Sequence, residues 1–144
     1  DAGAATVTFH LEAVADPLPI LQAIRSKGVK TGLAINPDIS EERLVPYLGE
    51  VDIVLIMSVF AGFGGQAFID SSLNKIRFIR RVIDSRFAHG EGPLIEVDGG
   101  INAQNAGIVF DAGADVLVAG NAIFHSSNPE QVIATMANGG SLGE

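Results

Sequence analysis

The hydrophobic residues are concentrated in short apolar, β-branched stretches, and segments with helical spacing of apolar residues lie between them. Five such stretches predict strands, at 5–9, 31–35, 53–57, 94–97 and 116–119. Each stretch is nearly all apolar, which is typical of parallel strands that are covered on both faces. The pattern therefore predicts an α/β fold made of about five parallel βα units.

Three helices are predicted between these strands. The first covers 17–27, with Asp16 as its N-cap, Pro17 at the first helical position, and Lys27 and Gly28 at its end. The second covers 41–48 after a Ser40 cap, although Pro46 interrupts it. The third covers 71–86, where apolar residues recur every three or four positions as Leu73, Ile76, Ile79 and Ile83.

A repeated tetrapeptide bears on how complete the fold is. Asp-Ala-Gly-Ala occurs at 111–114, where it reads as a helix end and a glycine turn before a strand, and it occurs again at 1–4. We therefore expect the chain to begin in the last turn of a helix that it does not contain. A closed barrel of eight such units would need about 230 residues, which would leave roughly three units outside this chain. An open five-stranded sheet of the flavodoxin type is the alternative.

The composition of the 144 residues narrows the classes of partner. Seventeen acidic and nine basic residues give a net charge of −8, so we expect neither a nucleic-acid partner nor an anionic membrane, and an anionic ligand would have to be held locally. There is no cysteine, which excludes disulfides and thiolate chemistry. No apolar run is long enough to cross a bilayer and the start has no signal-peptide pattern, so the sequence predicts a cytoplasmic protein.

Candidate ligand loops follow the last three predicted strands. Gly62, Gly64 and Gly65 come after the third strand and could direct successive backbone N–H groups at an anion. Asp98 ends the fourth strand, where parallel α/β folds carry their active sites, and Gly99-Gly100 is expected to leave room for a ligand beside it; the alternative role for Asp98 is an Asx-type cap. Gly120 and Asn121 follow the fifth strand at the start of a short helix that could bind phosphate.

Together these motifs resemble the ribulose-phosphate 3-epimerase family. The resemblance is carried by Leu-Ile-Met-Ser-Val at 55–59, Gly-Phe-Gly-Gly-Gln-Ala-Phe at 62–68, Ile-Glu-Val-Asp-Gly-Gly-Ile at 95–101 and Val-Ala-Gly-Asn-Ala-Ile-Phe at 118–124. Segments 8–13 and 32–37 resemble the same family. The match extends from the fourth to the eighth strand of the family's (β/α)8 barrel. It implies a partial barrel of C-terminal βα units over 1–138, and we expect 139–144 to be a flexible tail.

The resemblance also implies an activity and roles for individual residues. The activity is interconversion of D-ribulose 5-phosphate and D-xylulose 5-phosphate by metal-assisted, two-base proton transfer at C3, so the expected partner is a small ketose phosphate. Asp98 would be both an acid/base and a ligand of a divalent metal, either Zn, Fe, Mn or Co. Met57 would form the floor under the reacting carbons. The residues implied in binding substrate, chiefly its phosphate, are Gly62, Phe63, Gly64, Gly65, Asp98, Gly99, Gly100, Gly120 and Asn121.

Two departures from the family pattern affect what this chain can do. Phe60-Ala61 replaces the Asn-Pro or Glu-Pro pair before the glycine loop, which removes a fixed φ angle. The family's substrate serine, its His-x-Asp pair and a further metal histidine belong to the first three strands, which are not in this chain. We therefore expect either a homo-oligomer or a missing N-terminal half. Two other functions stay open: epimerisation of allulose 6-phosphate, and non-catalytic phosphate binding by a partial barrel that assembles with a second copy or a partner.

Overall fold

Five parallel strands form one sheet in the computed structural model, which describes residues 2–60, 62 and 64–139. The strands are β1 Thr6–His10, β2 Lys30–Ile35, β3 Ile53–Met57, β4 Leu94–Asp98 and β5 Val116–Val118. All five predicted strands are confirmed, with ends that differ by one residue at most. The last strand ends at Val118 rather than at 119.

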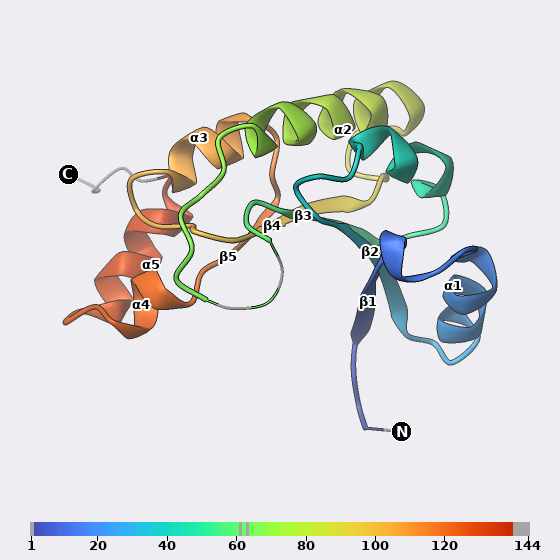
Figure 1. The fold of residues 1–144 in the computed structure, drawn as a ribbon, viewed down its shortest axis with the longest axis horizontal. Helices are drawn as coiled ribbons and strands as arrows, with labels where there is room; N and C mark the ends of the chain where they lie inside the picture. The colour runs from blue at the N-terminus through green and yellow to red at the C-terminus, as the bar shows by residue number, and fades with distance from the viewer. Residues whose placement is uncertain (1, 61, 63, 140–144) are drawn as a thin grey trace.

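The order of the strands decides between the two predicted architectures. Each strand pairs in parallel with the next one along the chain, in the order β1-β2-β3-β4-β5. A flavodoxin-type sheet instead reverses its strand order near one edge and carries helices on both faces. The sequential order, with the main helices along the convex side of an arched sheet, is the arrangement of barrel units (Figure 1).

The helices differ from the predicted ones mainly at their ends. They are η1 Leu11–Ala13, α1 Leu18–Arg25, η2 Glu41–Tyr47, α2 Ser72–Arg86, α3 Ala106–Asp111, α4 Asn121–Phe124 and α5 Pro129–Ala137. None of the helices in the described residues is long and apolar enough to cross a membrane.

Two helix predictions need correction. The helix predicted over 41–48 ends one residue earlier, at Tyr47, and is a 3-10 helix, η2, in which Pro46 cannot donate the backbone hydrogen bond that an α-helix requires. Ser40 caps it as predicted, because its hydroxyl accepts from the N–H of Glu42. The helix predicted to begin at Pro17 begins one residue later, although the Asp16 carboxylate still accepts from the N–H of Leu18 at 3.0 Å.

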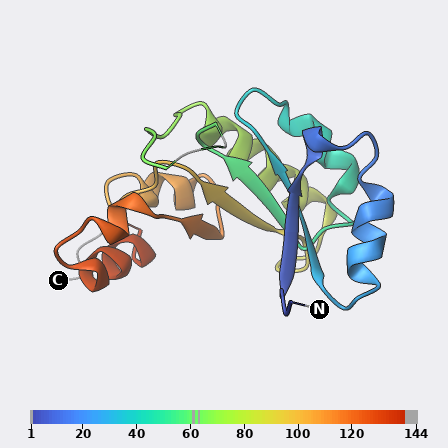
Figure 2. The same ribbon diagram turned by 60° about the horizontal axis from the view of Figure 1, so that its bottom comes forward.

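The two faces of the sheet have different environments. On β3 and β4 the side chains that face the helices, Val54, Ile56, Ile95 and Val97, are fully buried in the main hydrophobic core. The alternating positions face the concave side, where Leu94 and Val116 are exposed. Figure 2 shows this concave side between β1 and the α4–α5 end of the molecule. The sheet therefore has a packed outer face and an open inner face.

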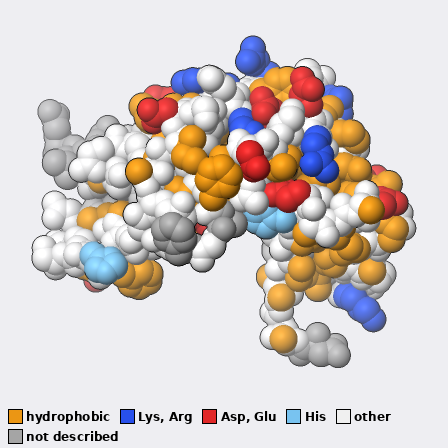
Figure 3. Space-filling model, viewed as in Figure 1, with side chains coloured by type: hydrophobic (Ala, Val, Ile, Leu, Met, Phe, Trp, Pro, Cys, Tyr) orange, Lys and Arg blue, Asp and Glu red, His pale blue; other side chains and the backbone are white. Residues whose placement is uncertain are grey.

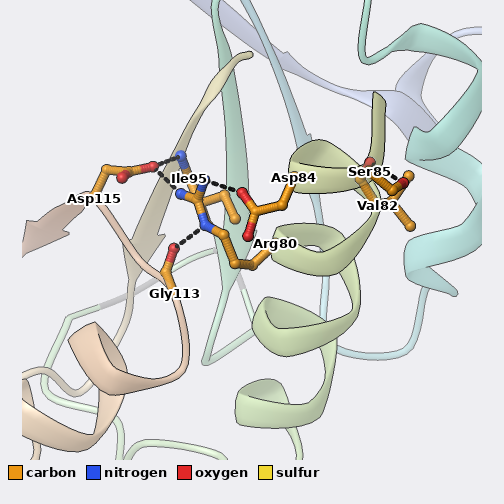
Figure 4. Close-up of polar contacts among 7 residues, drawn as sticks. All are labelled: Arg80, Val82, Asp84, Ser85, Ile95, Gly113 and Asp115. Atoms are coloured by element: carbon orange, nitrogen blue, oxygen red, sulfur yellow. Dashed lines mark hydrogen bonds and ion pairs between the residues drawn. The ribbon is translucent and has the colours of Figure 1, made fainter. Parts of the chain in front are cut away.

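A partly buried carboxylate–guanidinium contact joins α2 to the start of β5. Arg80 donates to the carboxylate of Asp115 and to the carbonyl oxygen of Gly113, and the same Asp115 oxygen accepts from the backbone N–H of Ile95 at 2.8 Å (Figure 4). Asp84, one helical turn along α2, lies 3.5 Å from Arg80 and is more exposed. The contact fixes β5 beside β4, and so it holds the loop that follows β5 in place.

We expect Asp115→Ala to lower the free energy of unfolding by about 2 kcal/mol, because it leaves the N–H of Ile95 without its acceptor and removes one of the carboxylates that bind the guanidinium of Arg80. Asp84→Ala is the matched control and should change that free energy by about 0.5 kcal/mol or less, as is usual for exposed pairs. Urea unfolding followed by circular dichroism measures both. Equal effects of the two substitutions would contradict this role of Asp115.

Candidate functional site

An open cavity of about 1020 Å³ lies at the carboxyl ends of the strands. Figure 3 shows the molecule hollowed on the side of the sheet that faces away from α2. The carboxyl ends of parallel strands are where barrel enzymes carry their active sites. The predicted residues that line the cavity are Met57, Gly62, Gly64, Gly65, Asp98, Gly99, Gly100, Gly120 and Asn121. Three loops predicted separately from the sequence therefore meet at one cavity.

Asp98 is the last residue of β4, and its carboxylate lies at the cavity. It is in register with Met57 on β3 and Val118 on β5, so these three side chains stand in one row across the concave face. No group in the described part of the chain donates a hydrogen bond to the Asp98 carboxylate, and burial raises the pKa of this carboxyl above its ordinary value. A half-buried carboxylate that accepts no hydrogen bond from these residues is available to a ligand.

Glu96 lies on the same face of β4, two residues before Asp98. Burial and the neighbouring charge of Asp98 both raise the pKa of Glu96. The charge of Asp98 therefore disfavours ionisation of Glu96 on the concave face.

The glycine turn after Asp98 lines the cavity and also packs against the loop that follows β3. Gly100 has φ +65°, and a Cβ there would overlap the backbone nitrogen of Phe68. A Cβ on Gly99 would lie 2.8 Å from the backbone nitrogen of Val59. The glycines thus allow the β3–α2 loop to pack directly against the β4 turn, a role that the sequence did not indicate.

Ser58 links the β3–α2 loop to the turn after β4 by hydrogen bonds, although it was not among the predicted site residues. Its side chain is fully buried, and its hydroxyl donates to the carbonyl oxygen of Gly99 at 2.7 Å. Its backbone N–H donates to the carbonyl oxygen of Asp98, and its own carbonyl oxygen accepts from the N–H of Ile69. A buried hydroxyl directly after an apolar strand is the signal that could have identified it.

Asx-type capping after β4 is performed by asparagines rather than by Asp98. The side-chain oxygen of Asn102 accepts from the N–H groups of Gln104 and Asn105, and Asn105 donates to the carbonyl oxygen of Gly100 at 2.9 Å. The alternative role considered for Asp98 is therefore wrong, and its carboxylate remains at the cavity.

The loop after β3 is in contact with the loop after β5. Gly62 has φ +152° and Gly65 has φ +80°, conformations that glycine adopts without strain. The carboxamide of Asn121 lies against this loop, so that a Cβ on Gly65 would be 2.5 Å from its side-chain nitrogen. The sequence indicated only a backbone role for Asn121. Phe63 lies outside the described residues.

The start of α4 lies at the other side of the cavity. Gly120 and Asn121 begin this helix, and first-turn N–H groups have no acceptor within a helix. His125, at the end of α4, also lines the cavity, and its Nδ1 lies 3.2 Å from the carbonyl oxygen of Asn121. Met57 is buried beneath the cavity, in register with Asp98.

The donor set for a divalent metal is incomplete. Within the described residues, no group of three or more His, Asp or Glu side chains could hold a metal ion. Asp98 is the single residue that the family resemblance assigns to the metal, and one carboxylate does not bind such an ion tightly. The residues of this chain therefore do not by themselves form a metal centre.

Comparison with known proteins identifies the family. The model of the ribulose-phosphate 3 epimerase family matches residues 1–124. The chain belongs to this family. Ribulose-phosphate 3-epimerase from Mycobacterium leprae (strain TN) is 40% identical over 137 residues, and the enzyme of the same name from Escherichia coli (strain K12) is 43% identical over 135 residues. Each alignment covers 94% of this chain but 59% of the relative, so the chain spans well under two thirds of the length of these epimerases.

Solved structures support the fold of this epimerase-family chain. A 3-hexulose-6-phosphate synthase from Salmonella typhimurium matches with a TM-score of 0.66 and 23% identity, covering 96% of this chain and 62% of that one. A structure described as KGPDC from Streptococcus mutans matches with a TM-score of 0.63 and 15% identity, covering 96% and 61%. These structures are of the TIM-barrel type, and at such low identity the likeness concerns the fold alone.

Proposed function

We propose that this chain forms the phosphate-binding half, and one of the two proton-transfer groups, of a site that interconverts D-ribulose 5-phosphate and D-xylulose 5-phosphate. The observation that carries the proposal is the placement of Asp98: a half-buried carboxylate, with no hydrogen-bond donor among the described residues, at the end of β4 among three glycine-containing loops. Membership of the ribulose-phosphate 3-epimerase family supports the choice of substrate.

The role of Asp98 follows from the chemistry of the reaction. Epimerisation at C3 removes the proton next to the C2 ketone and delivers another to the opposite face, with an enediolate between the two steps. The ionised Asp98 carboxylate would accept the C3 proton on one face. Because burial raises the pKa of Asp98, this carboxylate is a stronger base than an ordinary aspartate.

Delivery of a proton to the opposite face of C3 requires a second acid/base group. The resemblance places that group in the first three strands of the family's barrel, which are not in this chain. We propose that the chain acts with those strands, supplied by an N-terminal half or by another copy. The same resemblance implies a divalent metal, of which Asp98 would be a ligand, and the other ligands would come from the same first three strands.

Phosphate binding would rest on backbone N–H groups. The chain has a net charge of −8, and the cavity is lined by glycines from three loops rather than by lysine or arginine. We propose that the N–H groups of the loop containing Gly62, Gly64 and Gly65 and those at Gly120 and Asn121 hold the phosphate. Phe63, which lies between Gly62 and Gly64 in the sequence, is part of the same proposed phosphate-binding loop. Met57 would form an apolar floor under the planar intermediate.

Proton NMR in D2O tests this proposal on the chain as it stands. D-ribulose 5-phosphate is incubated with the protein, with and without Zn²⁺, Mn²⁺, Fe²⁺ or Co²⁺, and the C3 proton signal is followed together with the appearance of D-xylulose 5-phosphate. We expect slow loss of the C3 signal without inversion. Inversion would show that the chain or its oligomer builds both acid/base groups, and an unchanged C3 signal would contradict the proposed role of Asp98.

A further inference from the structure

A second polar cluster lies on the concave side, at the end of β1. His10 is the last residue of β1, and its Nδ1 lies 3.0 Å from a carboxylate oxygen of Glu12 in η1. The same oxygen accepts from the backbone N–H of Asn36, directly after β2, at 3.1 Å. The Glu12 carboxylate therefore ties the carboxyl ends of β1 and β2 together and holds the ring of His10.

The contacts of Glu12 determine which nitrogen of His10 carries the hydrogen. Burial opposes ionisation of Glu12, but hydrogen bonds from its own N–H, from His10 and from the N–H of Asn36 outweigh burial and lower the pKa of this carboxyl. An ionised carboxylate can only accept hydrogen bonds. Nδ1 of His10 is therefore the donor, and Nε2 is the nitrogen left for another partner.

His10 lines the same cavity as Asp98, at its other end. His10 on β1 pairs in register with Ala34 on β2, and Ala34 pairs with Leu55 on β3. Because β4 is the next strand after β3, β1 lies three strand positions away from β4. Three strand spacings amount to about 14 Å along the sheet, and the arch of the sheet shortens the direct path. A ligand with its phosphate among the glycine loops and its carbon chain over Met57 would extend toward Nε2 of His10.

A purely structural role does not account for this cluster. Joining β1 to β2 needs one oxygen at position 12, which a neutral glutamine would supply. Glu12 instead keeps a second carboxylate oxygen that is buried and has no hydrogen-bond partner among the described residues, and no described residue bonds to Nε2 of His10. Leaving a buried carboxylate oxygen unpaired is unfavourable, so the arrangement points to a ligand rather than to stability.

We propose that His10 binds, through Nε2, the hydroxyl and carbonyl end of the sugar that lies away from the phosphate, and that Glu12 is the positioning residue that fixes the His10 ring. The inference rests on the proposed function, because it assumes a sugar phosphate in the cavity. It adds a recognition group for the carbon chain at the end of the site opposite the glycine loops.

NMR of the ¹⁵N-labelled chain tests the inference with two probes, inorganic phosphate and D-ribulose 5-phosphate. We expect the imidazole nitrogens of His10 to show the Nδ1–H tautomer in the free protein. D-ribulose 5-phosphate should shift the Nε2 resonance and inorganic phosphate should not, whereas the backbone amides of Gly65 and Gly120 should respond to both. His89, in an exposed loop away from the cavity, should respond to neither probe.

Two substitutions separate binding from folding. His10→Gln should weaken binding of D-ribulose 5-phosphate about tenfold, equivalent to one lost hydrogen bond, and leave binding of inorganic phosphate unchanged. Glu12→Gln should weaken sugar-phosphate binding in the same direction and abolish the tautomer preference of His10. His89→Gln is the matched control and should change neither affinity. If His10→Gln does not fold, the tautomer and the Nε2 response of the wild-type protein still decide.

Two outcomes overturn the inference: an Nε2 resonance that ignores D-ribulose 5-phosphate, or a His10→Gln variant that loses affinity for both probes equally. Failure of the proposed phosphate site would look different. In that case the amides of Gly65 and Gly120 would respond to neither probe, whatever His10 does.

Discussion

The Asp98→Asn variant should lose at least about 99% of the C3 proton exchange that the wild-type chain catalyses, because an amide cannot accept the proton and general bases of this kind contribute a hundredfold or more. Asparagine has nearly the same shape, and no described group bonds to the Asp98 carboxylate, so the surrounding turn should be unchanged. Loss of the C3 proton signal in D2O measures the effect. Glu96→Gln is the matched control on the same face of β4, and it should keep most of the exchange.

The same substitution should slightly stabilise the metal-free protein at neutral pH. Burial raises the pKa of Asp98 in the folded chain, so the ionised carboxylate opposes folding at every pH above that raised value. Asp98→Asn removes this opposition and also relieves Glu96, whose pKa is raised by burial and by the charge of Asp98. We expect the midpoint of thermal unfolding to rise by about 2 °C at pH 7.5.

The direction of the pH dependence gives a separate check. Below the pKa of an unfolded aspartate both proteins are neutral at position 98, so the difference in unfolding midpoint should vanish there and should grow as the pH rises. The measurement is thermal unfolding in chelator-containing buffers from pH 3.5 to 8. An Asp98→Asn variant that is less stable than the wild type at pH 7.5 would show that Asp98 supports the fold instead.

Gly100→Ala should produce the largest loss of stability among the site variants. Its Cβ would overlap the backbone of Phe68, and alanine is strained at φ +65°. Together these effects should lower the free energy of unfolding by about 3 kcal/mol, and the β3–α2 loop should move away from the β4 turn. Because that loop carries glycines of the proposed phosphate site, binding of inorganic phosphate should weaken as well.

Gly49→Ala is the control for Gly100→Ala. A Cβ on Gly49 would meet no atom within 4 Å beyond its chain neighbours, and Gly49 does not adopt a positive φ, so the substitution should change stability by about 0.5 kcal/mol or less. Urea unfolding gives the stabilities, and isothermal titration with inorganic phosphate gives the affinities. A Gly100→Ala protein with wild-type stability would mean that the close approach of the two loops is not needed for folding.

The strands and the positions of the three loops could be predicted from the sequence because they depend on local patterns. An apolar β-branched run that ends in Asp98 and two glycines indicates a buried parallel strand and its turn without knowledge of its neighbours. The 3-10 form of η2 could not be predicted in the same way, because Pro46 disfavours an α-helix without specifying the structure that replaces it.

The contacts between the loops could not be predicted, because they join residues far apart in the chain. The hydroxyl of Ser58 reaches Gly99, forty-one positions later, and Glu12 accepts from the N–H of Asn36, twenty-four positions later. Single-residue propensities do not indicate such pairs. For the same reason the packing of Gly99 and Gly100 against the backbone of the loop after β3 was not predicted.

The contact between Asn121 and the glycine loop has a consequence for how a ligand enters and leaves. The carboxamide at the start of α4 lies against Gly64 and Gly65, so the loop after β3 cannot swing away without displacing a side chain that belongs to the loop after β5. Moving either loop would break this contact, so we expect the positions of the two loops to be coupled when a ligand binds.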